Sequence, residues 1–385
     1  MQSSVRPIVI TTPEGLAPFV EDELAAAGFP VVWASENAVG TKGDFPAAMR
    51  LNLWLRCAHH VLYQVEEFPC RDLDTLYRSA LALPWETVLP ADGYFSVVSS
   101  VNNPSIRDHR IVNLKCKDAV VDRIASRKGR RPDSGSERDG AVVTVFWNGE
   151  RCTISIDTSG EPLSKRGYRK IPLRAPMQET LAAGVVLATR LGAQEYFINP
   201  MCGSGTLAIE AAMIITGRAP GLTRENFGFM HTLLYDKAQW QHLCVDACSR
   251  CDVREQPVGR IIAGDNDPQV IAAARSNAAA AGVENIIEFV TGDFTETPIP
   301  GGDGVIVFNP EYGIRLGDEE QLVESYRAIG KFLKQRCQGY RGYVFTGNAK
   351  LAGNIGLKAG RKLRFQSGKI ECKLYEYELF RGRKE

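Results

Sequence analysis

From about residue 178 onward, the sequence alternates short apolar runs with longer stretches of helical periodicity. The apolar runs are typical of buried strands, and the stretches between them are long enough for crossover helices. This alternation predicts a doubly wound α/β domain, whose ligands bind at the carboxyl ends of its parallel strands. The final run, "CKLYEYEL", has a period of two residues, which predicts an antiparallel last strand.

The first ~160 residues mix strands and helices without regular alternation, which predicts an α+β region. Strands are expected at "RPIVITT" and "PVVWASEN" and a helix at "FVEDELAAAG"; after "LDTLYRSALALPW", a strand is expected at residues 94–101 and a helix at about 110–129. Two further strands, "AVVTVFW" and "RCTISID", are joined by Asn148-Gly149. Both of these residues tolerate positive φ, so the pair predicts a tight hairpin.

The length of 385 residues suggests two or three domains, and the 44% hydrophobic and 24% charged content is that of a globular protein. The sequence has no apolar run long enough to span a bilayer and no hydrophobic region typical of a signal peptide. We therefore expect a cytoplasmic protein. Ten scattered cysteines do not suggest a disulfide framework.

The net charge is only +1, so any surface for nucleic acid must be local. One basic cluster lies in or just after the helix expected at about 110–129, and a second lies in "SKRGYRKIPLR" from Ser164 to Arg174. A charge run alone favours a solvated surface. The candidate RNA-binding residues are Lys117, Arg123, Arg127, Lys128, Arg130, Arg131, Lys165, Arg166 and Arg169.

In "NPMCGSGTLAIEAAM", a strand ends, a turn containing Gly203 and Gly205 follows, and a helix starts at Thr206. Glycines let the backbone approach a ligand closely, and the first turn of a helix offers free amides. A tight strand-to-helix turn with no ligand has the same pattern.

The next two strand ends support a ligand. Asp265 directly follows a strand, where a carboxylate can accept both hydroxyls of a ribose. Asp267 precedes Pro268 and is expected to cap a helix. Asp293 can accept a hydrogen bond from the amino group of adenine, and the Phe294 ring can pack against the base. Since no phosphate-binding G-x-x-x-x-G-K-[ST] motif is present, the three strand ends together predict an adenosyl group without phosphates.

The fourth strand end, "VIVFNPEYGIRL", carries Asn309, Pro310 and Tyr312. The Asn309 side-chain oxygen and a neighbouring backbone carbonyl can both accept hydrogen bonds from one exocyclic NH2 group, and Tyr312 can stack on a flipped base. This arrangement suits alkylation of an amine by positioning and electrostatics alone. It indicates S-adenosylmethionine as methyl donor and requires no metal.

These motifs identify a resemblance to the THUMP-domain RNA methyltransferases of the class I, S-adenosylmethionine-dependent type. The similarity is greatest to the guanine-N2 half of bacterial large-subunit ribosomal RNA enzymes, and it covers nearly the whole chain. It is carried by Lys117–Ile124, "SIDTSGEPLSKRGYR", "APMQETLAA", "PMCGSGTLAIEAAM", "GDNDPQVI", "IECKLYEYEL" and "NPEY".

The resemblance implies a ferredoxin-like part at residues 1–60, a THUMP RNA-binding domain at 61–160 and a linker at 161–177. A Rossmann-like methyltransferase domain would follow at 178–385, with a mostly parallel seven-stranded sheet and an antiparallel last strand. The resemblance also favours RNA binding for the basic residues. The residues expected at the donor are Asn199, Cys202, Gly203, Gly205, Thr206, Asp265, Asn266, Asp293 and Phe294.

Two positions depart from the family pattern. The family usually has Asp where this chain has Asn199, and it usually has Asn-Pro-Pro-Tyr where this chain has Glu311 between Pro310 and Tyr312. A loop carboxylate is usually exposed to solvent. The alternative hypothesis is that Glu311 accepts a hydrogen bond from N1–H of guanine.

Several cysteines and histidines admit other interpretations. Cys244, Cys248 and Cys251 have the spacing of an iron–sulfur cluster, but the same spacing places three small apolar side chains on one helix face. Cys202 could serve as a nucleophile, although its place in the glycine turn suits packing against the donor. His59 and His60 are expected to be structural.

The resulting hypothesis is methylation of guanine N2 in RNA, with ribosomal RNA favoured and transfer RNA as an alternative. Adenine-N6 methylation uses the same tetrapeptide logic. A non-catalytic RNA-binding or assembly factor is the interpretation from a different class.

Overall fold

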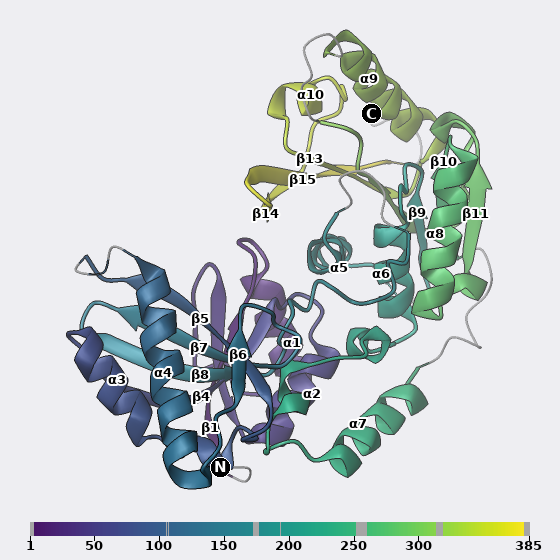
Figure 1. Cartoon of the computed structure of the whole chain (residues 1–385). Helices are drawn as coiled ribbons and strands as arrows, with labels where there is room; N and C mark the ends of the chain where they lie inside the picture. Colours follow the sequence, from purple (N-terminus) through teal and green to yellow (C-terminus); the bar gives the residue numbers. More distant parts are fainter. Residues whose placement is uncertain are drawn as a thin grey trace. The chain divides into compact units, whose positions relative to one another are not determined.

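The computed structural model describes residues 4–104, 106, 108–171, 177–192, 194–251, 260–312 and 319–380. Parts of the predicted linker and of "APMQETLAA", Arg174, and the residues just after Tyr312 lie outside them. The chain divides into two compact units, each with its own sheet (Figure 1). The first draws on the ranges 1–12, 20–165 and 224–246, and the second on 13–19, 166–223 and 247–385.

The sheet of the first unit has eight strands in the order β2-β3-β1-β4-β8-β7-β5-β6. Strand β5 is parallel to β6 and β7, and the other neighbouring pairs are antiparallel. This mixed pairing fits the predicted α+β class. The strands are β1 (Arg6–Thr11), β2 (Trp33–Ala34), β3 (Ala38–Gly43), β4 (His60–Pro69), β5 (Tyr94–Asn102), β6 (Asp133–Gly135), β7 (Ala141–Asn148) and β8 (Arg151–Asp157).

Strand β4 joins the two N-terminal parts that the resemblance implies. It pairs with β1 through Ile8 and Tyr63, and with β8 through Leu62 and Asp157. The predicted boundary after residue 60 falls at the first residue of this strand. The domain ranges stay a prediction, because both parts contribute to one continuous sheet.

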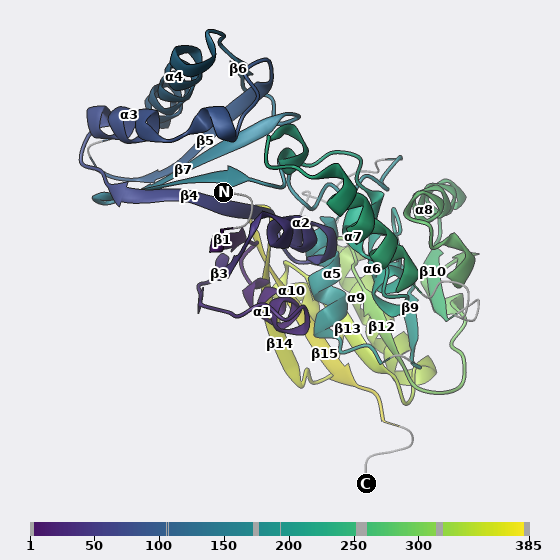
Figure 2. The same cartoon turned by 90° about the horizontal axis from the view of Figure 1, so that it is seen from below.

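Helices α3 (Leu73–Ala82) and α4 (His109–Lys128) lie side by side on one face of the first sheet (Figure 2). Helix α4 buries an apolar stripe that includes Val112, Cys116 and Ile124, which leaves its charged residues on the outside. The other helical segments in or crossing into this unit are α1 (Ala17–Ala26), α2 (Phe45–Trp54), η1 (Trp85–Thr87), η3 (Gly228–His231) and α7 (Lys237–Ser249).

The predicted hairpin between β7 and β8 is present, but its turn lies one residue later than expected. Asn148 pairs with Arg151, so the loop residues are Gly149 and Glu150. Gly149 has φ +56°, whereas Asn148 is the last strand residue and keeps a negative φ. The positive φ therefore falls on the glycine alone.

The sheet of the second unit has seven strands in the order β11-β10-β9-β12-β13-β15-β14. Strands β9 to β13 are parallel, and β15 is antiparallel to both β13 and β14. The predicted Rossmann-like sheet is confirmed. The strands are β9 (Tyr196–Asn199), β10 (Ile261–Asp265), β11 (Ile287–Thr291), β12 (Gly304–Phe308), β13 (Arg341–Thr346), β14 (Arg361–Ser367) and β15 (Ile370–Glu378).

Helices cover both faces of this sheet. Helices α9 and α10 pack on the face that carries Ile198, Ile306 and Phe308. Their contacts with this face form a continuous apolar core. The helical segments are α5 (Glu179–Ala188), α6 (Thr206–Ile215), η2 (Pro220–Thr223), α8 (Pro268–Ala281), η4 (Glu284–Ile286), η5 (Phe294–Glu296), α9 (Glu319–Arg336) and α10 (Ala349–Gly353). A search of the described residues finds no helix with the length and hydropathy needed to traverse a bilayer.

Candidate functional site

Three parallel strands of the second unit end at, or are directly followed by, a polar residue at one edge of the sheet. The chain builds the sheet outward from β9 through β10 to β11 and then returns to place β12 on the other side of β9. Asn199 ends β9, Asp265 ends β10, and Asn309 directly follows β12. Doubly wound sheets bind ligands at this kind of switch point. The strand order therefore brings the three polar residues to one candidate site.

The glycine turn, residues 201–205, connects β9 to α6. Gly203 has φ +52° and Gly205 has φ +83°, which side chains of L-residues rarely adopt. A Cβ at Gly205 would lie 3.0 Å from the Cβ of Ala274, so glycine there permits close packing of α6 on α8. A Cβ at Gly203 would meet no described atom within 4 Å. The turn thus leaves space beside Gly203.

Asp265 links the glycine turn to the next strand end. Its Oδ2 accepts a hydrogen bond from Gly203 N at 3.1 Å, and its Oδ1 accepts one from Asp267 N at 3.2 Å. The predicted capping role of Asp267 is confirmed, since its Oδ1 accepts from Gln269 N at 2.8 Å. Asn266 is exposed. The contact of Asp265 and Asn266 with a donor stays a prediction.

Asn199 and Asn309 each have a buried side-chain oxygen without a hydrogen-bond partner among the described residues. Asn199 is fully buried, and its Nδ2 donates to Val307 O of the neighbouring strand at 2.9 Å. An unsatisfied buried acceptor costs about 1–3 kcal/mol. Two of them at the ends of adjacent strands indicate a place where an N–H donor binds.

Tyr312 is half-buried beside the end of β13. A Cβ added to Gly347 would lie 3.1 Å from two atoms of the Tyr312 ring, so the absence of a side chain at Gly347 makes room for the ring. Cys372 Sγ donates to the Tyr312 hydroxyl at 3.7 Å. Burial raises the pKa of Tyr312 to about 12, so the ring is neutral at pH 7.

The other residues of the tetrapeptide differ in exposure. Pro310 is buried, whereas Glu311 exposes its carboxylate. The backbone oxygen of Glu311 accepts from the Tyr326 hydroxyl at 3.4 Å, and that hydroxyl also contacts Thr346 Oγ1 at 2.7 Å. The solvent-facing interpretation of Glu311 agrees with this exposure.

Asp293 and Phe294 both have contacts within the protein. Asp293 is exposed, and its Oδ1 accepts from Thr295 N at 2.9 Å, capping η5. The Phe294 ring lies edge-on to Phe308 and Phe332, with centroid separations of 5.8 and 5.9 Å. One face of the core cluster therefore holds Phe294 in place. Adenine contacts by these two residues stay a prediction.

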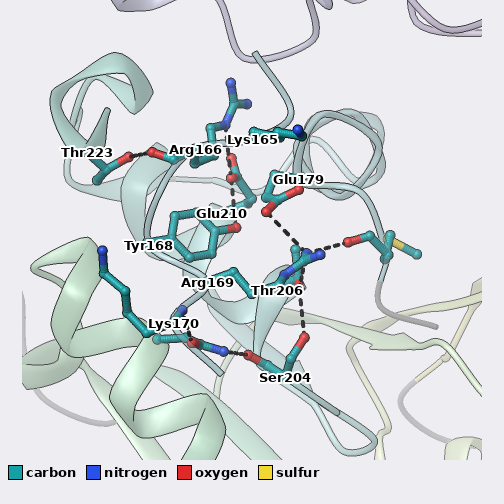
Figure 3. A network of polar contacts seen from close by, with 12 residues as sticks. Lys165, Arg166, Tyr168, Arg169, Lys170, Glu179, Ser204, Thr206, Glu210 and Thr223 are labelled. Carbon is teal, nitrogen blue, oxygen red and sulfur yellow. Dashed lines mark hydrogen bonds and ion pairs between the residues drawn. The ribbon is translucent and has the colours of Figure 1, made fainter. Parts of the chain in front are cut away.

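A largely buried polar network contacts Ser204 and Thr206 at the end of the glycine turn (Figure 3). The Arg169 guanidinium donates to Thr206 Oγ1 at 3.2 Å and pairs with Glu179 at 3.3 Å. Thr206 Oγ1 lies 3.1 Å from Ser204 Oγ, and Asn277 Nδ2 donates to Ser204 O at 3.1 Å. These bonds hold the first turn of α6 in position.

The burial of Arg166 contradicts its predicted RNA contact, and the partly exposed Arg169 is engaged in contacts within the protein. Arg166 is 1% exposed, and its Nε lies 3.4 Å from Oε1 of the fully buried Glu210, which also accepts from the Tyr168 hydroxyl at 3.1 Å (Figure 3). Arg169 is committed to the network described above. Glu179 and Glu210 lie in apolar helices, and burial raises the pKa of Glu179. A carboxylate inside an apolar helix needs a buried cation, and this was the signal that the sequence interpretation missed.

The other predicted RNA-binding residues lie at the surface, and most have carboxylate neighbours. Arg123 donates two hydrogen bonds to Glu86 at 2.8 and 2.9 Å, and these bonds lower the pKa of Glu86 to about 2. Carboxylates also lie within 4.0 Å of Lys117, Arg130 and Arg131, and near Lys165. Arg127 and Lys128 are exposed in the last turn of α4. RNA binding by these residues stays a prediction.

The cysteines singled out in the sequence differ in their burial. Cys202 is buried, and burial raises its pKa, which disfavours the thiolate that a nucleophile needs. Cys244 and Cys248 lie on α7, whereas Cys251 lies beyond its end, so the three do not share one helix face. The described residues contain no group of three or more His, Cys, Asp or Glu that could hold a metal. His60 Nδ1 contacts Asp157 at 2.7 Å.

A hollow of about 510 Å³ lies elsewhere, lined in part by Pro300, Gln335 and Tyr340. These residues precede β12 and β13, at the amino ends of the strands. Because doubly wound sheets bind ligands at the opposite edge, we do not assign this hollow to the candidate site.

Comparisons with known proteins agree with the two sheets. A family described as "RMKL-like, methyltransferase domain" matches residues 166–376. A family described as "RlmL ferredoxin-like domain" matches residues 7–62, and "THUMP domain" matches residues 70–157. The first match covers more than half of the chain.

Among curated relatives, "Ribosomal RNA large subunit methyltransferase K/L" of Syntrophotalea carbinolica is 36% identical over 380 residues. The alignment covers 96% of this chain and 53% of the relative. The chain thus spans about half the length of the curated relatives it matches.

Two solved structures share the whole architecture. One, titled as a "putative methyltransferase complexed with SAH", has a TM-score of 0.87 and 27% identity, covering 99% of this chain and 100% of the other. A "predicted N6-adenine-specific DNA methylase" from Listeria monocytogenes also has a TM-score of 0.87, with 33% identity, covering 97% of this chain and 96% of the other.

Proposed function

The chain belongs to the family of RMKL-like methyltransferase domains, and from that membership we propose that it methylates the exocyclic N2 amine of guanine in RNA. We propose S-adenosylmethionine as the methyl donor and 23S ribosomal RNA as the substrate. The name of the Syntrophotalea carbinolica relative and the matches to ferredoxin-like and THUMP domains support this substrate class.

The residues at the carboxyl edge of the second sheet fit an adenosyl donor. Gly203 leaves open space at the glycine turn, and the half-buried Asp265 carboxylate adjoins it. The Oδ1 of Asn199, to which no described residue donates, can accept a hydrogen bond from the donor's amino group. Cys202, Gly205, Thr206, Asn266, Asp293 and Phe294 complete the proposed donor set. When bound, the donor supplies an electrophilic methyl group attached to a sulfonium.

The observation that carries the proposal is the buried Oδ1 of Asn309, which has no hydrogen-bond partner within the part of the chain that the structure describes. A side-chain oxygen at this position, together with the carbonyl of the buried Pro310, accepts the two N–H groups of an exocyclic amine. This orients the lone pair of the amine nitrogen out of the plane of the base. The half-buried ring of Tyr312 stacks on the base. These groups position the amine without acting as a strong base.

Residues of the first unit supply the RNA-binding surface in this proposal. Arg127 and Lys128 are the exposed cations at the end of α4. In this proposal, phosphates of the RNA would replace the carboxylates that now neighbour Lys117, Arg123, Arg130, Arg131 and Lys165. Such exchange costs little for the exposed pairs of Arg130, Arg131 and Lys165, because exposed ion pairs contribute only about 0–1 kcal/mol. It costs more for Arg123, because its side chain and that of Glu86 are mostly buried.

The test combines donor titration with analysis of the product. We expect the wild-type protein to bind S-adenosylmethionine and to produce N2-methylguanosine in ribosomal RNA, detected by mass spectrometry of nucleosides. Asn309→Ala should keep donor binding and reduce methyl transfer at least 100-fold, because removing one positioned hydrogen-bonding group costs about 10²–10³ in rate. An Asn309→Ala protein with the wild-type rate would overturn the proposed site.

The same experiment examines Glu311. If its exposed carboxylate accepts the N1–H of guanine, Glu311→Gln will lower the rate on guanine substrates more than on adenine substrates. If Glu311→Gln changes neither the rate nor the selectivity between guanine and adenine substrates, the Glu311 side chain faces solvent and does not contact the base.

A second candidate function is adenine-N6 methylation, which the description of the Listeria monocytogenes structure favours. The same oxygen acceptors suit the N6 amine. N6-methyladenosine as the product would select this candidate. Failure to bind S-adenosylmethionine would instead favour a non-catalytic RNA-binding factor.

A further inference from the structure

The segment from α10 to the first half of β15 is strongly basic. Residues 349–373 contain seven cations and one carboxylate, in a chain whose net charge is +1. The cations are Lys350, Lys358, Arg361, Lys362, Arg364, Lys369 and Lys373. Most of them lie in the hairpin formed by β14 and β15. The sequence interpretation did not single out this cluster.

The register of the hairpin places two cations directly opposite each other. Arg364 pairs with Lys373 across the two strands, so both side chains project from the same face. Lys362, two residues before Arg364, shares that face and lies opposite Tyr375. Like charges in directly opposed positions destabilise a hairpin. An anionic partner would relieve this repulsion.

The cations of the hairpin differ in how far the protein itself satisfies them. Lys373 lies 3.4 Å from Glu371, and Arg361 lies 3.9 Å from Glu376. Arg364 and Lys369 are exposed, and within the described part of the chain neither has a carboxylate within 4.0 Å. These two residues, close to the turn at Gly368, are therefore available to a ligand.

The same end of the hairpin adjoins Tyr312. A Cβ added to Gly347 would lie 2.7 Å from Ile370 Cγ2 and 3.1 Å from Cδ2 of Tyr312, so Ile370 and Tyr312 border one small space. Ile370 is 49% exposed although it is a large apolar residue. The turn of the hairpin thus presents Ile370 beside the ring and Lys369 next to it in the chain, whereas Arg364 projects from the opposite face of the hairpin with Lys373.

The backbone edge of β14 is already in use. Gln366 N donates to Glu14 O at 3.2 Å, and Phe365 stacks on Phe19 with the ring centroids 6.3 Å apart. Strand addition by a peptide would need this edge to be free. The side chains of the hairpin, rather than its backbone, form the available surface.

We propose that the tip of this hairpin is an RNA-binding element of the methyltransferase unit. Lys369 at the turn and Arg364 on the opposite face of the hairpin bind backbone phosphates of the RNA, and Ile370 packs against the nucleotide next to the base held by Tyr312. The inference rests on the proposed function, since it takes Tyr312 as the platform for the base. It adds a binding surface in the second unit to the one expected on the THUMP-matching part.

The test compares the double variant Arg364→Gln/Lys369→Gln with Arg361→Gln as the matched control. Arg361 lies on the same hairpin at the end away from the turn and already has Glu376 as a partner. Binding of RNA is measured over a range of salt concentrations. Each lost phosphate contact lowers the slope of log K against log salt by about 0.7–0.9, so the double variant should lose about 1.4–1.8.

We expect the double variant to bind RNA on the order of tenfold more weakly at ~0.1 M salt, with unchanged affinity for S-adenosylmethionine. The Arg361→Gln protein should resemble the wild type. Equal salt slopes in all three proteins would overturn the inference while leaving the proposed function intact. Wild-type protein that binds RNA through Arg364 and Lys369 but transfers no methyl group would contradict the proposed function instead.

Discussion

Two short segments of this chain are rich in cations, but the structure pairs cations of the first with carboxylates inside the protein and leaves cations of the second exposed. In residues 164–170, Arg166 and Arg169 turn inward and pair with Glu210 and Glu179. In the hairpin of β14 and β15, Arg364 and Lys369 remain exposed without such partners among the described residues. A buried carboxylate elsewhere in the fold decides which cations become structural. Cation density in the sequence alone does not identify an RNA-binding surface.

Helix α4 carries cations of both kinds, paired and exposed. Arg123 is bound by Glu86, whereas Arg127 and Lys128 are exposed at the C-terminal end of the helix. Cations in the last turn also interact favourably with the helix dipole. Measurements of stability and of the salt dependence of RNA binding can distinguish structural cations from RNA-binding cations in these three regions.

The largest effect is expected for Arg166→Ala. Removing one partner of a buried ion pair leaves an uncompensated charge, which costs about 3–5 kcal/mol of the free energy of unfolding. Urea denaturation followed by tryptophan fluorescence measures it. Lys165→Ala is the neighbouring control, because Lys165 is exposed and should change stability by no more than about 0.5 kcal/mol. Equal losses in the two variants would show that Arg166 is not structural.

An intermediate effect is expected for Glu86→Gln. The folded pKa of about 2 lies below the ordinary value of 4.5, so the pair stabilises the protein above pH 4.5 and loses that contribution as the pH falls toward 2. At pH 7 we expect a loss of about 1 kcal/mol. The stabilities of variant and wild type should converge in acid, as measured by denaturant melts at several pH values. A difference that is independent of pH would contradict the assignment.

The smallest effect is expected for Lys128→Gln, which should leave stability unchanged. If Lys128 contacts a phosphate, the salt slope of RNA binding should fall by about 0.7–0.9. Lys117→Gln is the comparison, because Asp118 lies 3.5 Å from Lys117 and already offsets its charge. A larger change for Lys117 than for Lys128 would reverse the proposed order of the two residues.

Much of the fold could be predicted from local patterns. The alternation after residue 178 predicted the parallel sheet, and the cap at Asp267 and the hairpin after β7 were recognisable from their residue types. Strands β3, β4, β6 and β14 and helices α2 and α3 were not predicted. The edge strand β14 reads "RKLRFQS", in which charged residues obscure the apolar alternation.

The candidate site was predictable in its residues but not in its contacts. The sequence placed polar residues after three strands, and the strand order brought Asn199, Asp265 and Asn309 to one edge. The sequence did not indicate that Asn199 Nδ2 donates a hydrogen bond to Val307 O, because the two residues are 108 positions apart in the chain. Nor did it indicate the polar network that supports the glycine turn.

The sequence by itself determined the alternation of strands and helices after residue 178 and the chemistry available at each strand end, because periodicity and turn residues act over a few neighbours. The tertiary structure decided which charges are buried and which remain exposed. That choice depends on carboxylates brought close by folding, such as Glu210 near Arg166, and on the absence of any near Arg364 and Lys369 among the described residues. Charge compensation is a property of the folded neighbourhood, so no local pattern encodes it.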